Sequence, residues 1–185
     1  MELFGWGRKN TADVNKKGQL LTYTEVFSTE YDAAHDGDSF TMDIDAKSVN
    51  GAEHLCVLKN GHSTNEMVIS SVTLWMDAYK KTTFIEARLN ETFSYLAEGT
   101  KVVPTNVSAG KVGGAQGDFY VIAAAGTDIT TFAGTAVIAG RFIFTTTPIK
   151  WTKVSGWHIP PGQVFSLYNN GQDNIYSGYI SFYYK

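Results

Sequence analysis

The sequence predicts an all-β fold, a jelly-roll-like antiparallel β-sandwich with an extended N-terminal arm. Short segments in which apolar and polar residues alternate recur through most of the chain. Turn signals rich in Gly, Asn, Asp and Pro separate them at intervals typical of sandwiches and barrels. The composition agrees, because 14% of the 185 residues are aromatic and only 18% are charged. A chain rich in Tyr, Phe and Thr favours sheets over helices.

The strand signals begin at Ser39 and continue to the end of the chain. Phe40, Met42 and Ile44 alternate with polar residues, which predicts a half-buried strand. Similar signals predict strands over 54–59, 67–76, 82–89, 119–123, 135–147, 149–154, 164–168 and 175–184. Gly140 lies inside the most apolar of these and predicts a bulge or a close backbone approach. Several links are too long for tight hairpins, which favours Greek-key or jelly-roll connections.

Two segments between the strands need separate interpretation. Phe93, Leu96 and Ala97 have helical spacing and Gly99 would end the helix, so 90–101 is the best helix candidate. A strand fits this segment almost as well, and the sequence leaves the choice open. Residues 157–162 predict a rigid corner, because two consecutive prolines fix φ and remove two hydrogen-bond donors.

The chain divides into an extended arm and lead-in over residues 1–37 and a sandwich domain over 38–185. Within the arm, 8–19 is polar and shows no clear period, whereas 20–27 can form a short strand. The tip carries Leu3, Phe4 and Trp6, and exposed apolar surface favours association. These three residues are therefore expected to bind a neighbouring subunit. The alternative is a frayed terminus without a role.

The net charge and the hydropathy of the chain limit the kinds of partner that it is expected to bind. The net charge is −3 and the Lys and Arg residues are scattered, which argues against binding nucleic acid by neutralising phosphates. The sequence contains no apolar run of about 18 residues, so no membrane-spanning helix is expected. No run of signal-peptide length is found near Met1. We expect a soluble protein made in a cytoplasm.

The metal-like patterns are weak, and neither a metal nor another cofactor is expected. Asp32, His35, Asp36 and Asp38 form the most metal-like stretch, but an ordinary turn that leads into a strand is the favoured interpretation. Cys56 is interpreted as a buried small hydrophobe. His54 and Cys56 would share one face of a strand, yet no second pair of zinc ligands is visible.

The sequence assigns no catalytic residue, and the chain is predicted not to be an enzyme. It contains no nucleophile elbow and no phosphate-binding loop. Glu86, Glu91 and Glu98 are the candidates for a carboxylate pair of the glycosidase type. They are interpreted as solvated edge residues. A small hydrolase on a jelly-roll scaffold is therefore the third-ranked hypothesis.

A carbohydrate- or receptor-binding module of a virion or cell surface is the alternative function. It requires exposed aromatic rings on which sugars can stack. The candidates are Trp151, Trp157, Tyr168, Tyr176 and Tyr179. In a sandwich most such rings pack in the core or on strand faces, and that is the favoured interpretation.

Four segments carry a resemblance to a known class of protein: 18–24, 132–142, 156–165 and 177–184. In overall style they resemble small β-sandwich structural proteins of tailed bacteriophages, of the head-decoration kind. The resemblance covers the last third of the chain and the arm. It implies a virion structural protein without enzymatic activity, made in the host cytoplasm, that sits on the phage head as an oligomer, often a trimer. The implied partners are the major capsid protein or neighbouring virion subunits, and neither nucleic acid nor membrane is among them.

Overall fold

The structure is a computed structural model, which describes residues 2–5, 8–14, 20–24, 33–34, 36–78, 83–90, 95–96, 99–108, 114–127, 129–131, 136–144, 149–171 and 173–185. Within 2–5, 8–14 and 20–24 it describes the strand backbone alone. No helix within these ranges is long and apolar enough to cross a membrane.

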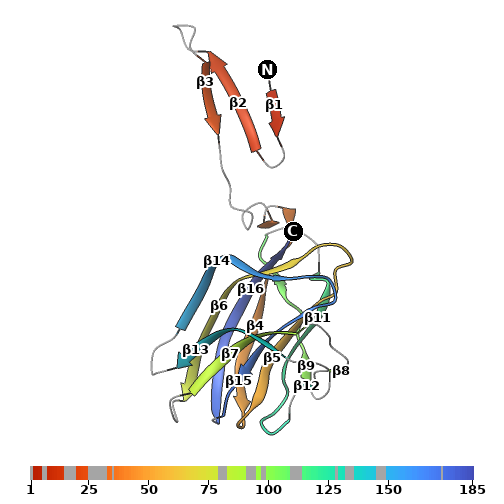
Figure 1. Cartoon of the computed structure of the whole chain (residues 1–185), viewed down its shortest axis with the longest axis vertical. Helices are drawn as coiled ribbons and strands as arrows, with labels where there is room; N and C mark the ends of the chain where they lie inside the picture. Colours follow the sequence, from red (N-terminus) through yellow and green to blue (C-terminus); the bar gives the residue numbers. More distant parts are fainter. Residues whose placement is uncertain are drawn as a thin grey trace.

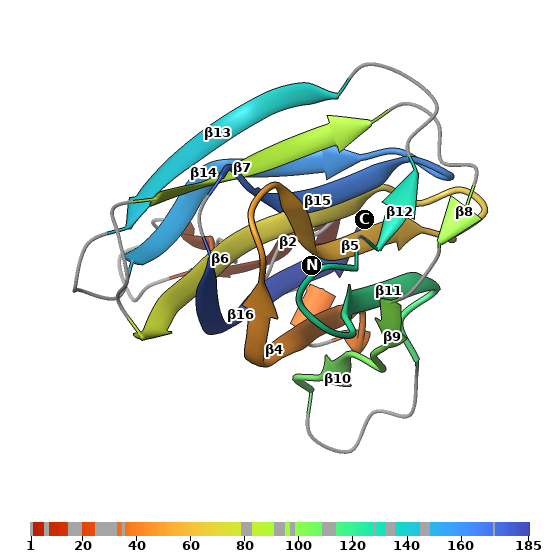
Figure 2. The same ribbon diagram turned by 90° about the horizontal axis from the view of Figure 1, so that it is seen from below.

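The predicted all-β sandwich is confirmed. One sheet has five strands in the order β10-β4-β16-β6-β14, and the other has six in the order β13-β7-β15-β5-β11-β9. The two sheets pack face to face (Figures 1 and 2). Their strands are β4 (Ser39–Val49), β5 (Glu53–Asn60), β6 (Met67–Ala78), β7 (Thr83–Asn90), β9 (Gly99–Lys101), β10 (Thr105–Asn106), β11 (Gly117–Ile122), β13 (Val137–Phe144), β14 (Ile149–Ile159), β15 (Val164–Asn169) and β16 (Asn174–Tyr184).

Eight of these strands have the connectivity of a jelly roll. In chain order, β4 pairs with β16, β5 with β15, β6 with β14 and β7 with β13, all antiparallel. This is the pattern of one long hairpin. Its first strand pairs with its last strand, its second with the last but one, and so on to the two middle strands, which pair with each other. Rolling that hairpin up places alternate pairs in opposite sheets, which gives the two Greek keys of a jelly roll.

The chain between β7 and β13 adds strands to the edges of this framework. Here β11 pairs with β5 and β9 pairs with β11, so the six-stranded sheet extends past β5. The short β10 extends the other sheet past β4, and β8 (Tyr95–Leu96) pairs with β12 (Thr130–Thr131). The sequence left 90–101 open between helix and strand, and the described residues of this segment, 90, 95–96 and 99–101, lie in strands.

The core lies between the two sheets and follows the predicted alternation. Phe40, Met42 and Ile44 are buried, whereas Asp43 and Asp45, between and after them, are exposed. The Phe182 ring of β16 stacks on Phe40 of β4 and on Phe119 of β11, with centroids 5.6 and 5.4 Å apart. Because Phe119 belongs to the opposite sheet, this stack joins the two layers. Face-to-face contact of this kind excludes water from the apolar surfaces that hold the sandwich together.

The bulge predicted at Gly140 is present. The register of β13 against β7 shifts between Ile138 and Gly140, so that Ala139 is the extra residue. Ile138 then lies opposite Arg88 and Arg141 lies opposite Glu86. Since Arg88 and Glu86 are two residues apart on one strand, they share a face. The bulge therefore places Ile138 and Arg141 on the same face of the sheet, although they are three residues apart.

The end of β14 and the start of the proline corner differ from the predicted boundaries. β14 runs to Ile159 instead of ending at Val154, because a register shift between Thr152 and Trp157 lets pairing with β6 resume. The rigid corner accordingly begins at Pro160. There the Gln163 N–H donates to the Pro160 carbonyl (3.0 Å), and Gly162 has a φ of +79°. This is the geometry of a type II turn, which needs Gly at its third position.

The N-terminal region contains more regular structure than the sequence predicts. β1 (Glu2–Gly5), β2 (Arg8–Val14) and β3 (Leu20–Thr24) form an antiparallel three-stranded sheet that shares no strand with the sandwich (Figure 1). The strand predicted for 20–27 is found over Leu20–Thr24. The segment 8–19 shows no clear period in the sequence, but Arg8–Val14 forms β2, because β2 pairs with a strand on each side.

Candidate functional site

Two of the three residues predicted to bind a partner lie in the N-terminal sheet. Leu3 and Phe4 belong to β1, where the backbone alone is described, and Trp6 lies outside the described residues. Their role stays a prediction.

The metal-like stretch is only partly described. Asp36 and Asp38 are exposed, and Asp32 and His35 lie outside the described residues. Within the described part of the chain, no group of three or more His, Cys, Asp and Glu could hold a metal ion. Cys56 is fully buried in the core, as predicted, and burial raises the pKa of its thiol far above its usual range. A thiol held protonated is a poor nucleophile.

The aromatic candidates for sugar binding are dispersed. Trp157 and Tyr176 lie in the core, and the Tyr176 hydroxyl donates to Asn169 Oδ1 at 2.9 Å. Tyr168 lies beneath an arginine, and Tyr179 is partly exposed on the opposite sheet. The side chain of Trp151 lies outside the described residues. The candidates that are described therefore do not form one exposed platform.

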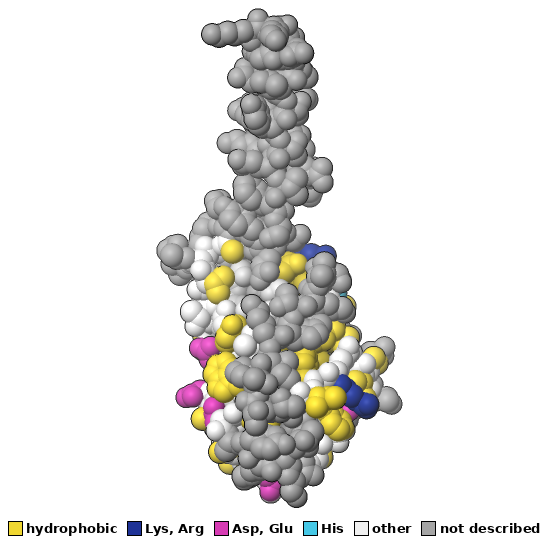
Figure 3. Space-filling model, turned by 90° about the vertical axis from the view of Figure 1, so that its left-hand side faces the viewer, with side chains coloured by type: hydrophobic (Ala, Val, Ile, Leu, Met, Phe, Trp, Pro, Cys, Tyr) yellow, Lys and Arg dark blue, Asp and Glu magenta, His cyan; other side chains and the backbone are white. Residues whose placement is uncertain are grey.

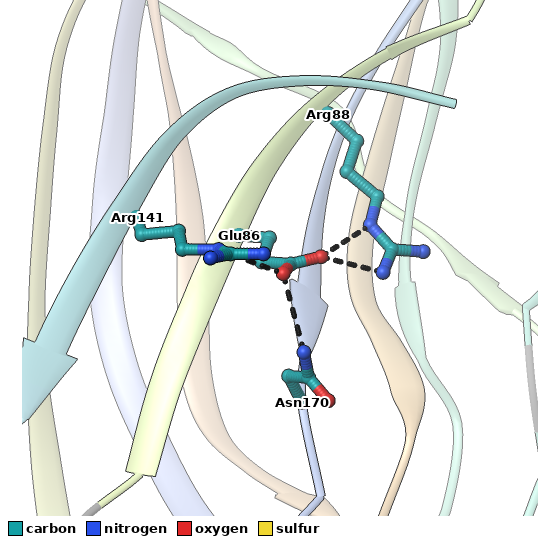
Figure 4. Close-up of polar contacts among 4 residues, drawn as sticks. All are labelled: Glu86, Arg88, Arg141 and Asn170. Atoms are coloured by element: carbon teal, nitrogen blue, oxygen red, sulfur yellow. Dashed lines mark hydrogen bonds and ion pairs between the residues drawn. The ribbon is translucent and has the colours of Figure 1, made fainter.

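The structure brings together a charged cluster on the outer face of the six-stranded sheet (Figure 4). Glu86 on β7 accepts hydrogen bonds from Arg88 Nε (2.9 Å) and Nη2 (2.5 Å) through Oε2. Its other oxygen, Oε1, accepts from Arg141 Nε on β13 at 3.0 Å and from Asn170 Nδ2 at 3.2 Å. We call these four residues the Glu86 cluster. It joins β7 to β13 and to the turn after β15.

Glu86 is a buried anion, contrary to the prediction that it is a solvated edge residue. Only 1% of its side chain is exposed. Burial opposes ionisation, but the hydrogen bonds and positive charge of Arg88, with the bonds from Asn170 and Arg141, outweigh it and lower the pKa of the carboxyl below its usual value. Glu91 and Glu98 lie outside the described residues. A carboxylate that is ionised and fully hydrogen-bonded does not serve as a proton donor.

The two arginines are held in different ways. The Arg88 guanidinium carbon lies 3.5 Å from the centroid of the Tyr168 ring, so the side chain is fixed by stacking as well as by Glu86. The Arg141 side chain is 58% exposed, and its Nε alone bonds Glu86. Because Nε is held by Glu86 while the side chain is largely exposed, the guanidinium of Arg141 is fixed in advance at the surface.

Exposed aliphatic side chains lie beside Arg141 on the same strand. Val137, Ile138 and Ile143 are 57%, 46% and 63% exposed, and β13 is the last strand of its sheet. We call Ile138, Arg141 and Ile143 the β13 edge surface; Val137, next to Ile138, projects from the other face of the strand. An edge strand leaves one row of backbone groups unpaired, and exposed apolar residues on it favour association. Arginine is among the residues enriched in the centres of protein interfaces.

The arrangement can bind but offers no visible chemistry. The Glu86 cluster holds one carboxylate, which is already neutralised, and no nucleophile among its described contacts. The sequence contained one indication of the Glu86 cluster. Glu86 and Arg88 are two residues apart on a predicted strand, so their side chains lie on one face of it. The third partner, Arg141, comes from a distant strand whose register depends on a bulge, and no sequence pattern specifies that register.

Comparison with models of protein families, with curated proteins and with solved structures finds no match for this chain.

Proposed function

We propose that the protein is a non-enzymatic structural subunit of a virion, of the capsid-decoration type, which assembles as an oligomer on a phage head. The observation that carries the proposal is the β13 edge surface. Large aliphatic side chains stay in water there although the chain has a complete core. In a structural subunit such a surface is covered by a neighbour.

The fold and the Glu86 cluster support the same function. Double-sheet jelly rolls are a recurrent architecture of viral capsid and lectin domains, although fold alone does not decide function. Glu86 accepts hydrogen bonds that join strands, and one of its partners, Arg141, stays 58% exposed and accessible to a binding partner. The lectin-like alternative loses support, because Trp157 and Tyr176 are core residues.

Immunogold labelling tests the virion assignment. An antibody raised against the purified chain is applied to virus particles from the culture in which the protein is made. We expect label on the heads of intact particles, and none on particles from a mutant that lacks the protein. Unlabelled particles, with the protein recovered only in the free fraction of the lysate, would contradict the proposal.

A further inference from the structure

A second surface with the opposite charge lies on the outer face of the five-stranded sheet. Asp43 and Asp45 on β4 and Asp77 on β6 are exposed, and the partly exposed rings of Trp75 and Tyr179 lie on the strands beside them. We call these five residues the acidic–aromatic face.

Strand register places these side chains on one face. Tyr179 of β16 lies opposite Asp43 on one side and Thr73 on the other. Trp75 and Asp77 follow Thr73 at intervals of two residues, so their side chains share its face. Ser177 Oγ donates to Asp77 Oδ2 at 2.5 Å and accepts from the Ala46 N–H at 3.0 Å. Asp77 is thereby fixed in place, as Arg141 is fixed by Glu86.

The two surfaces lie on different sides of the sandwich. The β13 edge surface belongs to the six-stranded sheet and the acidic–aromatic face to the five-stranded sheet. Figure 3 shows the molecule from the side where β13 and β14 lie in Figure 1. Most of the visible Asp and Glu side chains lie along the left margin of this view, and the visible Lys and Arg side chains lie toward the right. One copy therefore cannot bring its own two surfaces together, but two copies can.

We infer that the β13 edge surface of one copy binds the acidic–aromatic face of the next copy, so that the chain assembles head to tail. The charges are complementary, since the Glu86 cluster carries two arginines for one carboxylate and the opposite surface carries three exposed aspartates. The apolar parts match as well, because Ile138 and Ile143 would cover Trp75 and Tyr179. Arginine and aromatic residues are enriched where interfaces are energetically strongest. The inference rests on the proposed function and deepens it by naming the self-contact.

A head-to-tail contact restricts the assemblies that can form. Each copy uses two different surfaces, so a pair of copies still has one free surface of each kind. Growth continues until the ends meet in a ring or extends as a filament. The account predicts an assembly larger than a dimer and is consistent with a trimer.

Charge reversal on the full-length chain tests the contact. The first variant is Arg141→Glu, and the second, on the other surface, is Asp43→Lys with Asp45→Lys. A third chain combines all three changes. Lys101→Glu is the matched control, because Lys101 is 60% exposed on β9, at the opposite edge of the six-stranded sheet. Sedimentation velocity measures the assembly, and thermal unfolding followed by circular dichroism shows that each variant is folded.

The expected result is an assembly larger than a dimer in the wild type and the control. The first two variants should associate at least about tenfold more weakly, and the combined chain should recover assembly, because the charges are complementary again. If Arg141→Glu unfolds, the Asp43 and Asp45 variant and Ile143→Asp test the same contact without touching Glu86.

Three results would overturn the inference. If both charge variants still form the wild-type assembly, this contact is refuted, but the proposed self-assembly, through another surface, is not. A wild type that stops at a dimer would refute the head-to-tail geometry. A wild type that stays monomeric would refute the inference and remove the self-assembly on which the proposed function relies.

Discussion

At the scale of single residues, Glu86 shows how a strand outer face can hold a buried charge. Its two oxygens accept four hydrogen bonds, two from Arg88, one from Arg141 and one from Asn170. A buried ion is costly unless its lone pairs are satisfied. Because the hydrogen bonds are charge-assisted, they are stronger than neutral ones. The cluster therefore stabilises the pairing of β7 with β13 and, through Asn170, the turn after β15.

Replacing Glu86 by Gln should destabilise the fold at neutral pH by about 1–3 kcal/mol, because the negative charge is lost and the amide nitrogen that replaces one oxygen cannot accept a hydrogen bond from an arginine. The pKa of Glu86 is lowered in the folded state, so its ionised form contributes stability above the unfolded pKa of about 4.3. That contribution is lost as the pH falls through the folded pKa. Urea unfolding at pH 7 and at about pH 3 measures the difference between wild type and variant, which should shrink in acid.

The control for this prediction is Asp118→Asn. Asp118 pairs with Lys101 at 3.7 Å, and both side chains are largely exposed. Exposed pairs contribute about 0–1 kcal/mol, so this change should have little effect at either pH. An equal loss of stability in the two variants would contradict the role assigned to the cluster.

At the scale of elements, β16 depends on glycine where it crosses the centre of its sheet. A Cβ on Gly178 would lie 2.1 Å from the backbone oxygen of Thr73 on β6. A backbone atom paired in a central strand cannot move aside as a flexible side chain can. The register shift of β16 against β4 between Tyr176 and Gly178 lies beside this close approach. Gly178 therefore fixes how tightly β16 lies against β6.

Replacing Gly178 by Ala should lower the free energy of unfolding by about 2–3 kcal/mol or more, because the added methyl group forces the two strands apart. Chemical denaturation of the purified variant measures the loss. Gly114→Ala is the matched control, since nothing lies within 4 Å of a Cβ built there, and it should change stability by less than about 0.5 kcal/mol. Similar losses in both variants would show that the close approach is not the cause.

The sequence predicted elements better than it predicted their partners. Alternation in Phe40, Met42 and Ile44 located β4 correctly, and Gly140 correctly indicated a bulge. The sequence could not decide between helix and strand for 90–101, because the pairing of β9 with β11 depends on a strand that lies further along the chain. The prediction that Glu86 is a solvated edge residue was wrong for a related reason. Whether a strand face meets water or neighbouring arginines is decided by strands distant in sequence.

At the scale of the whole molecule, the framework is an eight-stranded jelly roll to which the chain between β7 and β13 adds edge strands. The core cluster within the described residues begins at Phe40 and contains residues from both sheets. The N-terminal sheet shares no strand pairing with it. The proposed contact of the sandwich faces with further copies can thus be tested separately from the predicted contact of the arm with a partner.

Removing residues 1–24 separates these contacts. We expect the midpoint of thermal unfolding of the sandwich to change by no more than a few degrees, because β1, β2 and β3 form a separate sheet that pairs with no strand of the sandwich. The truncated chain should keep the self-assembly of the full chain, which leaves Leu3, Phe4 and Trp6 for another partner. Sedimentation of both chains measures this. Loss of the assembly in a truncated chain that is still folded would assign self-assembly to the arm.

The mass of the full chain in solution tests the central claim most directly. Light scattering coupled to size-exclusion chromatography gives that mass over a range of protein concentrations. The account predicts a particle of at least three times the 20.3 kDa chain, which becomes smaller when added salt screens the exposed charges. A particle of one chain mass at every concentration would contradict self-assembly through the sandwich faces.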